Sequence, residues 1–383
     1  MAGLYLHIPF CRQACHYCDF HFSTSLARKP AVLTAITKEI ELRARYFGPG
    51  AAPLTSLYFG GGTPSLLTAA ELNGLFAAIE RIFGWEVGAE ITLEANPHDL
   101  TPAWLAALRG TPVNRLSIGI QSFHEPHLRL MNRAHSAAEA LACVRYAQDA
   151  GFANLSIDLI YGIPAPDHTI WQHDLATALS LNVPHVSAYA LTVEPRTALG
   201  RWTEKGRFRP STDEFTAQQF EQLTASLTAG GYAHYEISNF ARPGAEARHN
   251  SAYWQGTAYV GIGPSAHSFD GYATRQANVA SNTGYVAALE RGEIPATIEH
   301  LSPRDLANEY LLTSLRTSCG TDLHHLREHF GRDLATTHAA TLADLTARGL
   351  ATVDCAANGS AVLRLTSAGR LLADDITLTF FEL

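Results

Sequence analysis

Three cysteines near the start of the chain have the spacing of a metal-binding loop. Cys11, Cys15 and Cys18 lie in the segment FCRQACHYCDF and form the pattern C-x3-C-x2-C, which differs from the paired C-x2-C knuckles that hold structural zinc. Thiolates are the usual ligands of iron–sulfur clusters, so this loop can bind three irons of a four-iron cluster and leave the fourth open to another ligand. A zinc site completed by a distant histidine, or three unrelated buried thiols, would also account for these cysteines.

A second group of polar residues and glycines follows short segments that are typical of strands. Glycine allows the backbone to approach a ligand closely, a carboxylate accepts hydrogen bonds from ribose hydroxyls, and a guanidinium matches a carboxylate. Each side chain alone could equally be a structural hydrogen-bonding group, but their recurrence at successive strand ends favours a common site. The residues are Gly61, Gly62 and Thr63 in YFGGGTPS, Glu94 in LEANP, Gln121 in GIQSF, Arg133 in MNRAH and Asp158 in DLIYGIP.

The first half of the chain must position these residues, and its pattern predicts a parallel sheet. Short β-branched or aromatic segments alternate with longer amphipathic ones, as in successive βα units. Six units are too few for a closed eight-stranded barrel, but a partial barrel also presents functional residues at the C-terminal ends of its strands. The predicted strands are 4–8, 56–59, 90–94, 115–118, 155–160 and 185–190, and the clearest helices are 30–46, 68–83 and 136–150. The last two helices begin with capping boxes, Thr68 with Glu71 and Ser136 with Glu139.

The sequence pattern changes in the second half of the chain, which predicts a different architecture there. A helix is expected at 214–230 and a strand at 233–237, and from Ser302 the pattern is mostly helical with a hairpin within 350–365. We therefore expect an α/β partial barrel with an extension at residues 1–295 and a small winged-helix-like α+β domain at 296–383. His324 and His325 are interpreted as a solvated helix face. The mixed charges around them favour a cap or partner surface over DNA binding.

Composition sets the broad class. The chain has 383 residues, of which 46% are hydrophobic and 17% charged, and a formal net charge of −8; these values predict a soluble globular protein without a nucleic-acid partner. The sequence contains neither a secretory signal nor a membrane-spanning segment, so we expect a cytoplasmic protein with at most peripheral membrane association. Cys143, Cys319 and Cys355 stand alone and are each interpreted as small buried hydrophobic residues.

The cysteine pattern, with Tyr17 before the last cysteine, resembles that of the radical S-adenosylmethionine (SAM) superfamily. The resemblance implies that Cys11, Cys15 and Cys18 bind a four-iron, four-sulfur (4Fe-4S) cluster. It also implies that SAM chelates the remaining iron through its amino and carboxylate groups. The superfamily's fold is a partial (β/α)6 barrel, which agrees with the pattern of strands and helices.

Within that superfamily the motifs resemble the oxygen-independent coproporphyrinogen III oxidase group, over residues 4 to about 165. LYLHIPFC, YFGGGTPS, LEANP, RLSIGIQSF, MNRAH and DLIYGIP carry the resemblance. It implies that Tyr5, Gly61 and Glu94 line the SAM on the cluster. The positions that would contact this SAM or a second, adjacent one are Tyr17, Gly62, Thr63, Gln121, Arg133 and Asp158.

Two departures distinguish the chain from the oxidases themselves. Asp19 and Phe20 stand where an oxidase has a further cysteine, and the first predicted strand begins near Leu4, without the oxidases' long N-terminal extension. Both are features of the HemW heme chaperones, a branch of the same group, and both argue against decarboxylation of coproporphyrinogen.

The segment HNSAYW is similar to the HNxxYW motif that is associated with heme binding in that branch. A neutral imidazole is a good axial ligand of heme iron and aromatic rings pack on the macrocycle, so His249 is the candidate ligand and His267 a weaker one. The resemblance thus implies a chaperone that passes heme to an acceptor such as a respiratory-chain apoprotein. An oxidase, or a radical SAM methyltransferase in which His249 is incidental, are the alternatives.

Overall fold

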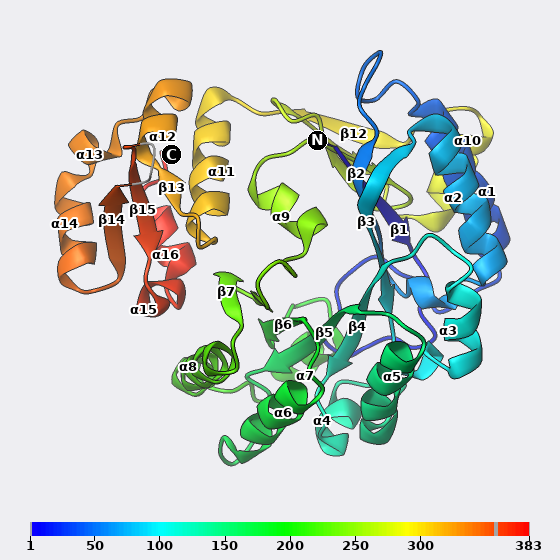
Figure 1. Ribbon diagram of the computed structural model, residues 1–383, viewed down its shortest axis with the longest axis horizontal. Helices are drawn as coiled ribbons and strands as arrows, with labels where there is room; N and C mark the ends of the chain where they lie inside the picture. The colour runs from blue at the N-terminus through cyan, green and yellow to red at the C-terminus, as the bar shows by residue number, and fades with distance from the viewer. Residues whose placement is uncertain (1, 356–358, 383) are drawn as a thin grey trace.

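The dominant feature of the fold is one twelve-stranded sheet whose centre is parallel (Figure 1). The computed structural model describes residues 2–355 and 359–382. The strands follow the order β12-β11-β10-β9-β1-β2-β3-β4-β5-β6-β8-β7, and the pairs from β1 to β6 are all parallel. These six strands are the ones predicted from the sequence: β1 (Gly3–Ile8), β2 (Leu54–Gly61), β3 (Trp85–Ala95), β4 (Arg115–Gln121), β5 (Asn154–Tyr161) and β6 (His185–Ala190).

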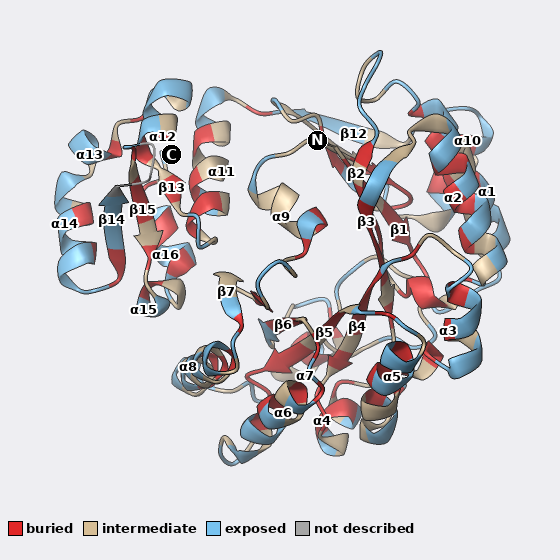
Figure 2. Cartoon of the chain, in the orientation of Figure 1, coloured by how far each residue is buried: buried red, intermediate tan, exposed pale blue. Residues whose placement is uncertain are grey.

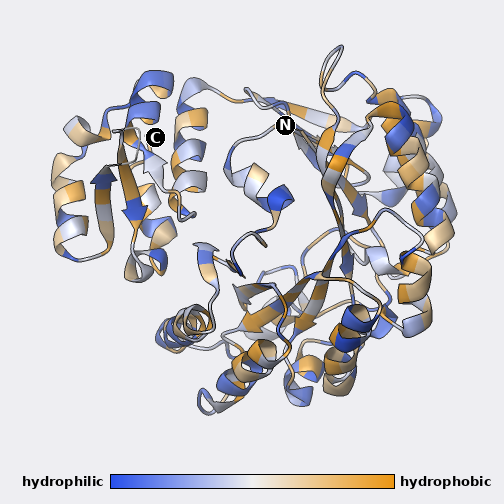
Figure 3. Ribbon diagram, in the orientation of Figure 1, coloured by the Kyte–Doolittle hydropathy of each residue, from blue (hydrophilic) through white to orange (hydrophobic). Residues whose placement is uncertain are grey.

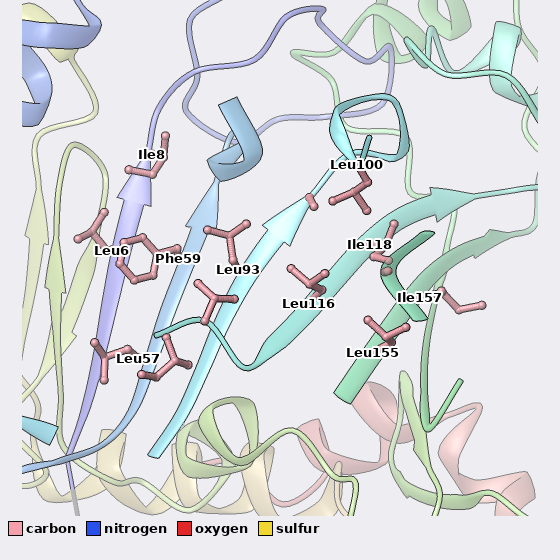
Figure 4. Packing of buried hydrophobic residues seen from close by; sticks show 14 of the residues in the cluster. Leu6, Ile8, Leu57, Phe59, Leu93, Leu100, Leu116, Ile118, Leu155 and Ile157 are labelled. Atoms are coloured by element: carbon pink, nitrogen blue, oxygen red, sulfur yellow. The ribbon is translucent and has the colours of Figure 1, made fainter. Parts of the chain in front are cut away.

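Helices cover the outer face of the parallel strands, so the expected partial (β/α)6 barrel is confirmed. Alternate strand residues such as Leu4, Leu6 and Ile8 are fully buried against these helices, because successive side chains of a strand point to opposite faces. Figure 4 shows this packing continuing across β2 to β5, and Figure 2 shows helices buried on the sheet side and exposed outside. The helices are α1 (Lys29–Leu42), α2 (Ala69–Ile82), α3 (Pro102–Leu108), α4 (Glu125–Leu130), α5 (Ala137–Asp149) and α6 (Thr169–Ser180).

Local signals fixed the starts of two of these helices. The Thr68 side chain accepts a hydrogen bond from the Glu71 backbone amide, and the Glu71 carboxylate accepts one from the Thr68 backbone amide. These two bonds form the predicted capping box of α2. Ser136 and Glu139 form the same arrangement at α5. Helix α1 is shorter than predicted, because residues 43–47 form a series of turns after Leu42.

Further strands, most of them in antiparallel pairs, extend both edges of the sheet, and most of them were not predicted. At one edge β9 (Tyr259–Ile262) pairs in parallel with β1 and is followed by β10 (His267–Phe269), β11 (Thr274–Asn278) and β12 (Ala296–His300). At the other edge β8 (Asn239–Ala241) joins β6 to β7 (Ala233–Glu236), the strand expected at 233–237. The helices of this half are α7 (Ala198–Glu204), α8 (Asp213–Ala229), α9 (Arg248–Trp254) and α10 (Asn282–Glu290).

The C-terminal part has its own hydrophobic cluster, built around Leu311, Leu326 and Leu363. The predicted hairpin is present as the antiparallel strands β14 and β15, while its turn at 356–358 lies outside the described residues. Figure 3 shows the alternation of hydrophobic and hydrophilic residues on its helices. The elements are α11 (Pro303–Leu315), β13 (Thr321–Asp322), α12 (Leu323–Phe330), α13 (Leu334–Thr337), α14 (Ala339–Ala347), β14 (Ala351–Cys355), β15 (Ala361–Leu365), α15 (Ser367–Arg370) and α16 (Ala373–Leu378).

Main-chain hydrogen bonds join this part to the barrel, since Ser318 N donates to Tyr235 O at 2.9 Å and Ile237 N to Arg316 O at 3.0 Å. The division at residue 296 stays a prediction, and β12, which follows it directly, belongs to the large sheet. No helix among the described residues is long and apolar enough to cross a membrane.

A buried ion pair connects the β9–β12 edge to α1. Arg43 and Glu39 are 3% and 0% exposed, and Arg43 Nε donates to Glu39 Oε1 at 2.7 Å. The carboxylate also accepts from Tyr285 OH at 2.5 Å, Asn278 Nδ2 at 2.8 Å and Gly263 N at 2.8 Å. Because a buried charge is tolerated only when it is paired and hydrogen-bonded, this network fixes the extension against the barrel.

We predict that Arg43→Met lowers the free energy of unfolding by about 3–5 kcal/mol, because it leaves the Glu39 carboxylate buried without its cation. The matched control is Arg81→Met, which breaks the exposed ion pair with Glu41 and should cost about 0–1 kcal/mol. Urea unfolding followed by circular dichroism measures both. Equal losses for the two variants would contradict a stabilising role of the buried network.

Candidate functional site

The carboxyl ends of the parallel strands and the cysteine loop enclose a cavity of about 470 Å³. This size falls within the usual range of small-molecule and cofactor sites, about 300–1,000 Å³. The structure thus brings together most of the predicted site residues, although they come from six different strand ends or loops. Those that line the cavity are Cys11, Cys15, Tyr17, Cys18, Gly61, Gly62, Thr63, Glu94, Gln121, Arg133 and Asp158.

The three cysteines line this cavity and are partly exposed. Thr63 Oγ1 donates to Cys11 Sγ at 3.4 Å and Arg133 Nη1 to Cys15 Sγ at 3.3 Å. Burial raises the pKa of Cys11 to about 11 and that of Cys18 to about 12, and a bound metal reverses this preference by stabilising the thiolate.

The chemistry of this donor set suits an iron–sulfur cluster. The three cysteines line one cavity, and two of their sulfur atoms have a hydroxyl and a guanidinium as hydrogen-bond donors. Thiolates are the usual ligands of such clusters, and hydrogen bonds to the sulfur atoms are typical of their surroundings.

Gly61 and Gly62 are required by packing within the protein. Gly61 has a φ of +104°, and a Cβ at this position would lie 2.5 Å from the His7 ring. A Cβ on Gly62 would lie 2.6 Å from the carbonyl oxygen of Phe10. The glycines therefore allow the loop after β2 to pack directly on the end of β1, where the cysteine loop begins.

Glu94 ends β3 inside the cavity and is already hydrogen-bonded. Its carboxylate accepts from Tyr58 OH at 2.7 Å and from Gly61 N at 3.1 Å. Burial raises the pKa of Glu94 to about 7 and that of Asp158, on β5, to about 6. Such shifts are common in ligand sites, and they leave both groups able to gain or lose a proton near neutral pH.

Gln121 is the last residue of β4, and Arg133 lies in the segment between α4 and α5. Arg133 Nη2 donates to Asn96 Oδ1 and to Gly119 O, each at 2.6 Å. Gln121 has a φ of +72°, a left-handed conformation that costs a non-glycine residue about 1–3 kcal/mol and is concentrated at functional sites. The β4–β5 register shifts between Gly119 and Gln121, which directs the Gln121 amide into the cavity.

Arg115 is a lining residue that the sequence interpretation missed. Its side chain is only 1% exposed, yet it borders the cavity, and its Nε has no hydrogen-bonding partner. The charge of Arg115 acts through space on Glu94 and Asp158 and favours their ionised forms. A signal was present in the sequence: in RLSIGIQ the polar residues alternate with buried aliphatic ones, which places Arg115 and Ser117 on the interior face of β4.

Tyr5, His249 and the weaker candidate His267 do not line the cavity, and His267 is exposed on β10. Tyr5 OH is 3.1 Å from His7 Nδ1, and its ring stacks on Tyr58 at 6.1 Å between centroids. Tyr58 in turn donates to Glu94. Tyr5 therefore supports the cavity wall from behind.

His249, on α9, is 1% exposed and both of its ring nitrogens are engaged. Nδ1 is 2.8 Å from Ser56 Oγ, and Nε2 is 2.8 Å from Tyr253 OH. Burial lowers the pKa of His249 to about 3, so the imidazole is neutral at physiological pH. In this conformation it has no free nitrogen for a metal. Of its neighbours in the HNxxYW segment, Asn250 lines the strand-end cavity, whereas Trp254 lines a different one.

Comparison with known proteins identifies the class of protein to which this chain belongs. The model of the radical SAM superfamily matches residues 5–174, and that of the HemN C-terminal domain matches residues 301–372. Among solved structures, coproporphyrinogen III oxidase (HemN) from Escherichia coli, described as a radical SAM enzyme, superposes with a TM-score of 0.83. It is 26% identical and the match covers 99% of this chain and 89% of that one. Fold and matches together define a radical SAM-type protein.

Curated relatives narrow the class. The heme chaperone HemW of Bacillus subtilis is 33% identical over 98% of both chains. The heme chaperone HemW of Mycobacterium tuberculosis is 37% identical over 98% of this chain and 94% of its own. The chain belongs to the HemW family.

We predict that His249→Asn reduces the pH dependence of folding stability. Because the pKa of His249 is lowered by burial, its contribution to stability is complete above the unfolded-state value of about 6.5 and is lost as pH falls. Between pH 7 and pH 5 the wild type should lose about 1–2 kcal/mol more than the variant. Urea titrations at several pH values measure this difference, and parallel pH profiles would show that His249 is not buried as a neutral imidazole.

Proposed function

We propose that this protein is a heme chaperone that carries a 4Fe-4S cluster with SAM and transfers heme to an acceptor protein. The observation that carries the proposal is the convergence of three cysteines and the polar strand ends on one cavity, in a chain of the HemW family. The acceptor would be a heme-requiring apoprotein, such as one of the respiratory chain. The transfer would take place in the cytoplasm.

Cys11, Cys15 and Cys18 would hold the cluster, and SAM bound to it would supply a radical or regulatory function. The chain's own residues orient the ligand and exclude water. Glu94, held by Tyr58 and Gly61, suits ribose hydroxyls, and Arg133 suits a carboxylate. Tyr5 would support this wall, and the residues for the remaining contacts, with one SAM or two, are Tyr17, Gly62, Thr63, Gln121 and Asp158.

The role of His249 as heme ligand stays a prediction and has a structural condition. Both ring nitrogens are now occupied, Nδ1 by Ser56 on β2 and Nε2 by Tyr253 on α9 itself. Iron could reach Nε2 only if the Tyr253 side chain turned away. It could reach Nδ1 only if α9 left Ser56, which would also break the 2.9 Å hydrogen bond from the His249 amide to Glu90 Oε1. Ligation by His249 therefore implies a local rearrangement of Tyr253 or of this helix.

The second candidate function is oxygen-independent coproporphyrinogen III oxidase, because the likeness to HemN extends over 99% of this chain. Conversion of coproporphyrinogen to protoporphyrinogen under anaerobic reducing conditions would establish it. Against it stands the end of the cysteine loop, where Asp19 and Phe20 replace the further cysteine expected of an oxidase and where the Phe20 side chain is 70% exposed.

We predict that replacing Cys11, Cys15 and Cys18 together by Ala abolishes the iron–sulfur absorbance but leaves heme binding within about twofold of wild type. Anaerobic reconstitution followed by heme titration and absorbance spectroscopy tests both properties. The variant Cys143→Ala, which alters a buried cysteine on α5, is the control and should keep both. If wild-type protein binds no heme, the chaperone proposal fails and the oxidase is the function to test.

A further inference from the structure

The strand-end cavity extends along the whole length of β4. Arg115 is the first residue of this strand and Gln121 the last, and both line the cavity; six residue steps of about 3.3 Å make roughly 20 Å. We call the part bordered by Arg115 and Asn250 the inner end. Asn250 belongs to α9, which packs against β2 on the side of the sheet away from the outer helices (Figure 1).

Arg115 is a buried cation without a partner at this inner end. Its side chain is fully buried, and no hydrogen bond or ion pair joins its guanidinium to any residue that the structure describes. Thr92, its neighbour in the register of β3 and β4, also has a buried hydroxyl without a partner. An unpaired buried charge is costly and is therefore characteristic of a ligand site. The N–H donors of the guanidinium are available to such a ligand.

Asn250 adds a second unused polar group to the inner end. It is half-buried, and its side-chain amide forms no hydrogen bond within residues 2–355 and 359–382. The two serines of the lining are already engaged, because Ser117 Oγ donates to Asp158 Oδ1 at 3.3 Å and Ser187 Oγ to Asn239 Oδ1 at 2.6 Å. A guanidinium and an amide are therefore the groups that this end of the cavity offers to a ligand.

The surrounding charges favour a single carboxylate as the ligand. The planar fork of a guanidinium matches the two oxygens of a carboxylate, and an amide adds a further donor. The charge of Arg115 acts through space on Glu94 and Asp158, so a dianion such as phosphate would meet more repulsion from these two groups than a monoanion. This carboxylate differs from the one expected on the cluster, because the cysteine loop follows the carboxyl end of β1 whereas Arg115 begins the parallel strand β4.

We propose that Arg115 and Asn250 form a carboxylate-binding site at the inner end of the strand-end cavity. The choice of ligand rests on the proposed function, which supplies two carboxylates on flexible arms: a propionate of heme, and the amino-acid carboxylate of a SAM molecule that is not on the cluster. Because Asn250 belongs to α9, a ligand bound here also holds this helix against the barrel. The HNxxYW segment thereby gains a ligand contact that does not involve His249.

The first test uses sodium propionate, a carboxylate that requires neither the cluster nor heme. Thermal unfolding of the full-length protein is followed by circular dichroism, with sodium chloride at the same ionic strength as the reference. We expect saturating propionate to raise the unfolding temperature of wild type by about 2–5 °C and to leave that of Arg115→Met unchanged. Equal shifts in the two proteins, or no shift in wild type, would overturn the proposal.

Further variants separate binding from a structural role. Without propionate, Arg115→Met should unfold at a temperature no lower than wild type, because it removes an unpaired buried charge. Arg115→Lys keeps the charge but not the fork and should retain part of the propionate shift. Asn250→Ala should reduce the shift, whereas the control Ser251→Ala, at the next residue of α9 but in the lining of the other cavity, should keep it in full. Equal reductions by these two variants would overturn the role of Asn250.

Titration of anaerobically reconstituted wild type and Arg115→Met with ferric heme, its dimethyl ester and SAM identifies the source of the carboxylate. If a heme propionate binds, Arg115→Met weakens heme binding at least tenfold and leaves binding of the ester, which has no carboxylate, unchanged. If SAM supplies the group, the variant binds one SAM fewer per chain and keeps the cluster absorbance. Unchanged binding of both would overturn this choice of ligand. If wild type binds neither, the proposed function fails, while the propionate shift still decides whether the site exists.

Discussion

The alternation of side chains along the parallel strands is the constraint on which the rest of the structure depends. One face of each strand supplies aliphatic residues to the outer helices, so the other face is free to be polar. Strand pairing aligns these polar positions in layers: Ser56 lies beside Glu90, Glu94 beside Ser117, and Asp158 beside Ser187. A change of register by one residue would exchange the two faces, so the apolar packing that forms the core also determines which polar groups meet in the cavity.

The sequence predicted those parts of the fold that depend on local chemistry. Six strands, two capping boxes and the C-terminal hairpin were found because alternation, caps and turn residues act over a few positions. The edge strands β9–β12 were missed, since each is short and is stabilised by distant partners such as Glu39. For the same reason the burial of His249 could not be predicted: its partners Ser56 and Glu90 lie on β2 and β3, far away in the chain.

The candidate site shows the same difference between residues that local motifs identify and residues that distant packing brings together. Motifs located the strand-end residues, because strand ends are close to one another in any parallel barrel. Two isolated cysteines were both predicted to be buried, but only one prediction was right. Cys143 is buried in α5, whereas Cys319 is exposed and lines a cavity beside α11 and α12. Helix α9 lines both cavities, with Asn250 in the strand-end cavity and with Ser251 and Trp254 in the other. A movement of this helix would therefore be felt in both.

The position of β1 has a consequence for the order in which the chain can fold. It precedes all the other described strands in the chain, yet it pairs with β2 on one side and with β9, residues 259–262, on the other. Until that later segment leaves the ribosome, β1 has an open edge, and open edges are prone to wrong pairing. The cysteine loop follows β1 directly, so its final position is reached only late in synthesis. Binding of any ligand that needs the final position of this loop would accordingly follow, rather than guide, completion of the sheet.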